Sequence, residues 1–183
     1  MSPSAVPGRH RRRARWVLSA SCASVIVVGA WQIDRLCGVE AAIGSAVVAA
    51  TLGSSSHPSA SSLVFYPVAG GAYRALEITW QCSTYVAALP LLLLTALAAL
   101  LPSARPRSMV AVLVAGLVVV ASANQLRLLV IAAATARWGD DGFEVAHRLV
   151  GSGIVLLSVV AGLAAIVRLH GRTTSPRTEV PGT

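Results

Sequence analysis

Length, composition and charge together place this chain in a membrane. Of its 183 residues, 55% are hydrophobic and only 12% are charged, and the mean hydropathy is +0.71. These values exclude an ordinary soluble protein and leave no room for a large soluble domain beside the apolar segments. All 15 basic residues are Arg, and the net charge is +8. We interpret this charge as a sign of membrane topology and not of nucleic-acid binding.

Four strongly apolar runs predict membrane-spanning helices because each is close to the length that crosses the hydrocarbon core. They are Trp16–Ile33, Ile78–Leu101, Met109–Leu126 with an apolar extension to Ala136, and His147–Val167. We therefore predict an all-α polytopic bundle of about four transmembrane helices, forming a single domain over residues 16–168. A basic amino-terminal segment (1–15) and a disordered tail (169–183) flank it, both cytoplasmic.

A weaker fifth candidate, Leu36–Leu52, is rich in small residues and contains Glu40. The stretch GSSSHPSASS follows it, and such a Gly/Ser/Pro sequence cannot be a buried span. If Leu36–Leu52 crossed the membrane, the basic loop PSARPRS and the basic tail would lie outside, against the preference of Arg for the cytoplasm. We therefore predict a re-entrant or interfacial helix on the outer side.

The distribution of Arg indicates that both termini lie in the cytoplasm. With four crossings, the external pieces contain six of the seven acidic residues but only five Arg. Trp16 lies at the predicted inner boundary, and Trp31, Trp80 and Trp138 lie near the outer one, as in an aromatic belt. The remaining ten Arg are all on the cytoplasmic side: Arg9, Arg11, Arg12, Arg13, Arg15, Arg105, Arg107, Arg168, Arg172 and Arg177.

Three reactive or charged side chains reach the same depth in this topology. At about 1.5 Å of rise per residue, Cys82 lies roughly 28 Å above the inner boundary, Arg127 roughly 27 Å and His147 roughly 31 Å. That depth is the outer edge of a hydrocarbon core about 30 Å thick. Each residue alone has a simpler explanation, since a membrane Cys is usually a packing residue, an Arg often extends to the headgroups and a boundary His often caps a helix. Cys22, inside the first span, fits the packing explanation.

Acyl transfer by a thiolate needs these three groups together. The Cys82 thiol would attack a peptide carbonyl, and His147 would carry the proton from the thiol to the leaving amine. Arg127 cannot lose its proton, so it suits an oxyanion or a carboxylate better than it suits base catalysis. A helix amino terminus and cationic neighbours would favour the thiolate form of Cys82.

The order of these residues resembles the exosortase/archaeosortase family of membrane transpeptidases. The shared pattern is Cys82 followed by Ser83 and Thr84, the Asn124-Gln-Leu-Arg127 motif that closes the next span, and His147 on the last span, within residues 76–165. The resemblance implies a compact member that uses these three as catalytic residues. We predict no cofactor and no metal. Its partners would be exported proteins whose carboxy-terminal sorting signal has a short motif, a membrane helix and a basic cluster. An amine or water would accept the acyl group. Ser83 and Thr84 replace a small residue and Gly that are often found after the Cys.

Other polar residues have supporting or competing interpretations. Asn124 shares a helix face with Arg127 and either orients the guanidinium or marks the end of the helix. Glu144, three residues before His147, is placed to orient the imidazole. Asp140 and Asp141 fit a solvated turn in the sequence WGDDG.

Three alternatives would change the chemistry. A disulfide between Cys37 and Cys82 would make the nucleophile inert in an oxidising compartment. Ser152 and His147 are five residues apart on one helix, so their side chains diverge, which argues against a serine protease. Metal binding by His57 with Cys82 and His147 lacks close ligand spacing. The main rival is non-enzymatic: a small membrane scaffold or transporter subunit with Arg127 and His147 lining a polar path.

Overall fold

A computed structural model describes residues 7–52, 62–68 and 73–172 of the chain. It contains five helices and a two-stranded hairpin within these ranges. In chain order they are α1 (Pro7–Trp31), α2 (Ile33–Leu52), β1 (Leu63–Pro67), β2 (Tyr73–Glu77), a 3₁₀ turn (Trp80–Cys82), α3 (Thr84–Ala99), α4 (Pro106–Val145), a π-helix (Ala146–Gly151) and α5 (Ser152–Arg172).

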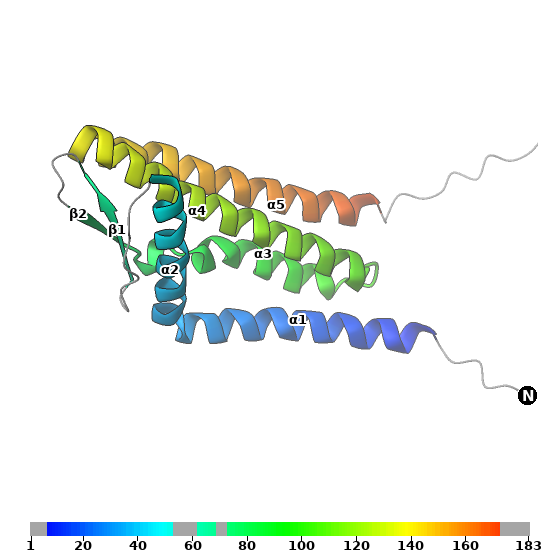
Figure 1. Cartoon of the computed structure of the whole chain (residues 1–183). Helices are drawn as coiled ribbons and strands as arrows, with labels where there is room; N and C mark the ends of the chain where they lie inside the picture. Colours follow the sequence, from blue (N-terminus) through cyan, green and yellow to red (C-terminus); the bar gives the residue numbers. More distant parts are fainter. Residues whose placement is uncertain (1–6, 53–61, 69–72, 173–183) are drawn as a thin grey trace, which may run out of the picture.

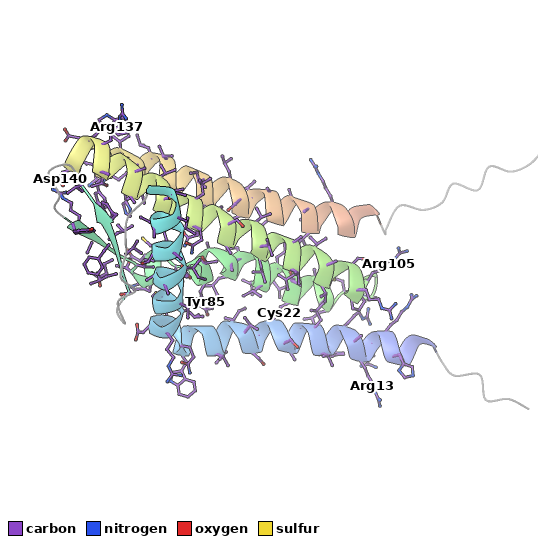
Figure 2. The ribbon with its side chains drawn as sticks, viewed as in Figure 1. Arg13, Cys22, Tyr85, Arg105, Arg137 and Asp140 are labelled. Carbon is purple, nitrogen blue, oxygen red and sulfur yellow. The ribbon has the colours of Figure 1, made fainter. Side chains whose placement is uncertain are left out.

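Four of the helices form an elongated bundle, and α2 crosses it near one end (Figure 1). Helix α3 packs against α1, α4 and α5, and α4 packs along α5. The start of α1 and the end of α5 lie at one end, where Arg13 and Arg105 also lie, whereas Arg137 and Asp140 lie at the opposite end (Figure 2). Arg15 Nη1 donates to the carbonyl oxygen of Leu101 at 2.8 Å and links α1 to the turn after α3 at the basic end.

Among the described residues, two helical stretches are long and apolar enough to cross a membrane, His10–Trp31 and Pro106–Arg168, and Thr84–Ala99 is a shorter apolar helix. Together with the composition, these stretches place the protein in a membrane. The predicted first span and Leu36–Leu52 match α1 and α2, although α1 begins nine residues earlier than predicted. Helix α5 continues to Arg172, so the chain is helical beyond the predicted domain boundary at 168.

The third and fourth predicted spans, 109–126 with its extension to 136 and 147–167, have different boundaries in the structure because the chain reverses direction at Gly139. This residue has φ +64°, which favours glycine, and it separates α4 into a long rising arm and a short piece that already belongs to the returning helix. The close approach of the two arms leaves no space for a side chain at Gly142, against the Ala134 carbonyl. The returning helix therefore begins seven residues before His147, which was predicted to open the last span.

The hairpin was not predicted from the sequence. Its strands are antiparallel, and Val64 pairs with Leu76 and Phe65 with Ala75. Val64 and Leu76 point into a buried cluster with Tyr66, Ile78, small residues of α2 and the upper part of α4. The sequence carried a weak hairpin signal: β-branched and aromatic residues in LVFYP, followed by Gly70-Gly71 before the YRALE run. The longer apolar helical runs on either side obscured it.

A separate cluster fills the long part of the bundle. Leu91 and Val120 are fully buried there, and Cys22 has only 2% of its surface exposed. The molecule thus has an apolar stem and, at the other end, a cap made of α2, the hairpin and the turn between α4 and its returning arm (Figure 1). The cap is where the polar residues of the bundle converge.

Candidate active site

Cys82 lies in a short turn that enters α3. Thr79 and Ser83 have extended backbone angles on either side of the 3₁₀ turn, so the predicted span from Ile78 becomes helical only at Thr84. Ser83 accepts a hydrogen bond from the Tyr85 amide at 3.1 Å and caps the helix. Cys82 is thus two residues before α3, not inside its first turns as predicted, and its side chain is partly exposed.

Cys82 and Arg127 meet, as the depth estimate predicted. Arg127 Nη2 lies 3.5 Å from the Cys82 Sγ atom, and only 9% of the Arg127 surface is exposed. The Arg127 Nε atom is buried and has no hydrogen-bond partner among the residues that the structure describes. Within the described ranges, the two recorded ion pairs, Arg74–Asp140 and Arg148–Glu144, do not involve this guanidinium. Its charge is therefore available to an anion at the sulfur.

His147 belongs to the π-helix of the returning arm. Its ring stacks on Phe143 with a centroid distance of 5.2 Å and an interplanar angle of 10°. The Nδ1 atom is buried and has no hydrogen-bond partner in the described part of the chain. A π-helical turn inside an α-helix is uncommon and often occurs at a functional site, because it displaces side chains from the regular helical positions.

The Arg127 side chain packs against Gly151, the last residue of this π-helix. A methyl group at Gly151 would lie 2.9 Å from both the Cγ and Nε atoms of Arg127, so the guanidinium stem passes directly over the glycine. His147 is four residues earlier on the same arm and interacts electrostatically with Arg127. Among the described residues, no hydrogen bond joins the imidazole to Cys82. The structure thus brings Cys82 into contact with Arg127 and places His147 four residues before Gly151, against which the Arg127 stem packs.

Asn124 binds the cysteine turn and not the guanidinium. Its Nδ2 atom lies 3.1 Å from each of three acceptors: the Cys82 carbonyl, Thr84 Oγ1 and Glu40 Oε2. It does not mark a helix end either, because α4 continues past it to the reversal at Gly139. Both predicted roles were therefore wrong, although the residue does lie at the site.

Glu40 was not recognised as a site residue from the sequence. Its carboxylate accepts hydrogen bonds from Ser83 Oγ at 2.8 Å, from the Thr84 amide at 2.9 and 3.0 Å, and from Asn124. The only sequence signal was an acidic residue within an apolar segment. Its partners depend on how α2 crosses the bundle, which the sequence does not specify.

The acidic residues near the reversal do not orient the histidine. Glu144 Oε1 pairs with Arg148 Nη1 at 3.0 Å on the exposed side of the helix, which contradicts its predicted role. Asp140 and Asp141 are exposed, as predicted for a solvated turn. A hydrogen-bonded ion pair with Arg74 lowers the pKa of Asp140 below its ordinary value and links β2 to the reversal.

The structure contains neither the Cys37–Cys82 disulfide nor a contact between the Ser152 hydroxyl and the His147 ring. Cys22, Cys37 and Cys82 are all free thiols, so the Cys37–Cys82 disulfide is absent, and the first two are buried. Ser152 Oγ donates to the backbone carbonyl of His147 at 3.4 Å and does not contact the imidazole ring. His57, the third residue of the considered metal site, lies outside the described residues.

These contacts define a membrane protein with a partly exposed thiol held against a buried arginine. The family model of the transmembrane exosortases matches residues 13–164, most of the chain, so the protein belongs to the transmembrane exosortase family. The match is wider than the motif-bearing stretch 76–165. The family is generally one of membrane cysteine proteases and transpeptidases. Neither a curated protein nor a solved structure matches the chain.

Proposed function

We propose that this protein is a membrane-embedded cysteine transpeptidase or protease that cleaves carboxy-terminal sorting signals of exported proteins at the outer face of the membrane. The observation that carries the proposal is the contact between Cys82 Sγ and Arg127 Nη2 at 3.5 Å. A buried arginine has a large desolvation cost, and a site that needs a positive charge beside a sulfur accounts for it.

The proposed reaction assigns one part to each of three side chains. The Cys82 thiol gives its proton to His147, and its sulfur attacks the peptide carbonyl carbon to form a tetrahedral oxyanion beside Arg127. The C–N bond then breaks, the leaving amine takes the proton from His147, and a thioester remains on Cys82. An amine acceptor or water attacks the thioester, which yields a new amide or a carboxylate and restores the thiol.

The polarity of the bundle supports the proposed orientation. Arg13 and Arg105 lie at one end and would face the cytoplasm, and the cap would face outside (Figure 2). Helix α2 crosses the other helices, as expected for a helix that lies in the interface instead of spanning the bilayer (Figure 1). We propose four crossings, by α1, α3, α4 and the returning arm with α5, and these would leave both termini inside.

An apolar groove supports a substrate with a membrane segment. The groove has a volume of about 1080 Å³ and lies between α1, α2, α3 and α4. Glu40 and Thr84 line it beside the cysteine turn, and it continues along α3 to Leu92, roughly 12 Å further along the helix. A substrate whose scissile carbonyl lies at Cys82 would therefore have an apolar groove beside it, lined along α3, into which its downstream segment could extend. We propose that the apolar segment downstream of the scissile bond occupies this groove.

The test compares two cysteines in cells. Cys82→Ala should abolish processing of surface proteins that end in a motif, an apolar helix and an Arg cluster, measured by mass spectrometry of the membrane fraction. Cys22→Ala, in the buried stem, should leave processing intact. Unchanged processing in an abundant Cys82→Ala protein would reject the enzyme and favour a scaffold or transporter subunit.

A further inference from the structure

Glu40 is connected to the cysteine turn more extensively than any proposed catalytic step requires. It lies on α2, yet its carboxylate receives four hydrogen bonds from residues of two other elements. Both oxygens accept from the Thr84 amide, Oε1 also accepts from Ser83 Oγ, and Oε2 accepts from Asn124 Nδ2. The carboxylate therefore caps the first amide of α3 from a different helix.

The residues that bind Glu40 are also those that hold Cys82. Ser83 and Thr84 follow the cysteine directly, and they are the two positions that depart from the usual family pattern. Asn124, with 1% of its surface exposed, connects Glu40 to the Cys82 carbonyl. Its amide nitrogen must face this side because all three neighbouring atoms act as acceptors toward it. The turn is thus held at its backbone by Asn124 and at its sulfur by Arg127, one helical turn apart on α4.

The charge of Glu40 is satisfied by neutral donors. Its partners are two side-chain groups and a backbone amide, and no ion pair joins it to Arg127 in the part of the chain that the structure describes. If the carboxylate paired with Arg127, it would neutralise the charge that the sulfur site uses. The arrangement keeps the acid close to the site but leaves the guanidinium available to the thiol.

We propose that Glu40 is a positioning residue that, through Asn124 and the Ser83–Thr84 turn, holds the Cys82 sulfur against Arg127. The inference rests on Cys82 and Arg127 acting together, as in the proposed function, but it does not depend on the substrate. A helix cap with only a structural role would stabilise α3 without changing how Arg127 acts on the thiol.

A double-mutant cycle on thiol reactivity separates these two roles. The purified full-length protein in detergent is treated with iodoacetamide at fixed pH, and alkylation of Cys82 is followed by peptide mass spectrometry. Cys22 and Cys37 are buried, so the signal comes from Cys82. In the wild type, Arg127→Gln should slow alkylation about tenfold, because a charged hydrogen-bond partner of the thiolate is lost.

In a Glu40→Ala background, the same Arg127→Gln change should slow alkylation less than about twofold, because the sulfur no longer lies against the guanidinium. Asp34→Ala is the matched control: it removes an exposed acid from the first turn of α2, and the tenfold effect should persist. The alkylation rates with and without Arg127→Gln are compared within each background. A change in thiol exposure caused by the background substitution affects both rates and therefore cancels in their ratio.

Glu40→Gln keeps an oxygen for the Thr84 amide and serves if Glu40→Ala does not fold. It should reduce the Arg127→Gln effect to roughly threefold, since it loses the bond from Asn124 and one of the two contacts with the Thr84 amide but keeps the other oxygen. An undiminished effect in the folded Glu40 variant, or an effect under twofold in the wild type, would overturn the proposal. If the cycle behaves as expected but Cys82→Ala leaves surface-protein processing unchanged, the positioning inference stands and the proposed function fails.

Discussion

The two ends of this bundle use the same kinds of residue for different purposes. In the stem, Cys22 is buried among Leu91, Val120 and other apolar side chains and makes no polar contact that the structure records. In the cap, Cys82 is partly exposed and touches a buried guanidinium. The difference comes from their neighbours, since the cap brings Glu40, Asn124 and Arg127 within hydrogen-bond distance of one turn. A cysteine in a membrane protein is therefore assigned a role by its partners and not by its hydropathy.

Among variants that keep Cys82, the largest effect should come from Arg127→Lys. Lysine keeps the charge but loses the planar fork that reaches both the sulfur and a developing oxyanion. We expect processing to fall by about 100-fold with an unchanged thermal midpoint. Arg137→Lys, at the exposed end of the rising arm, is the control and should be neutral. Activity near that of the wild type in Arg127→Lys would contradict the proposed role of the Arg127 guanidinium in stabilising the oxyanion.

In the stem, Leu91→Ala should affect stability and not chemistry. Leu91 is fully buried, and truncating it leaves a cavity that costs about 2 kcal/mol in packing, even without a hydrophobic driving force between helices in lipid. Unfolding in detergent should begin at lower denaturant concentration, while processing per folded molecule stays the same. A specific loss of processing with normal stability would show that the stem takes part in the site.

Gly151→Ala should have a smaller effect that is confined to the cap. The added methyl group would lie 2.9 Å from Arg127 Cγ and Nε, so the guanidinium must shift from the sulfur. We expect processing to fall by about tenfold, since small misplacements at a reacting centre are costly. Gly153→Ala meets nothing within 4 Å and should be silent. Equal behaviour of the two variants would mean that Arg127 does not need its observed position.

The smallest effect should come from Asp140→Asn at the rim of the cap. Because the Arg74 ion pair lowers the pKa of Asp140, its stabilisation is present above the ordinary aspartate pKa of about 3.9 and is lost as the pH falls through the lower folded-state value. Both side chains are solvent-exposed, so the midpoint should drop by about 1 °C or less at pH 7. The drop should shrink as the pH falls below the ordinary aspartate pKa. Asp141→Asn should show no drop, and a drop in Asp140→Asn that stays constant as the pH falls through this range would contradict the ion-pair explanation.

Residue spacing predicted the main helices and the meeting of Cys82 with Arg127, because helical rise converts sequence distance into depth. It did not predict the hairpin, whose short strands are weak signals beside long apolar runs. It also placed the start of the last helix too late. The structure is helical on both sides of Gly139, so a single residue with positive φ replaces the longer non-helical turn that was predicted. The role of Glu40 depends on the crossing of α2 over α3 and α4, and a long-range contact of this kind has no periodic signature.

The most direct test is to capture the acyl-enzyme. The purified protein is mixed with a peptide that carries a candidate motif followed by its apolar helix, quenched in acid and analysed by intact and peptide mass spectrometry. The account predicts a hydroxylamine-sensitive adduct on Cys82 whose added mass equals that of the peptide upstream of the cleaved bond less one water. Cys82→Ala should form no adduct. Cleavage of the peptide without any adduct on Cys82, or with an adduct on Ser152 instead, would contradict it.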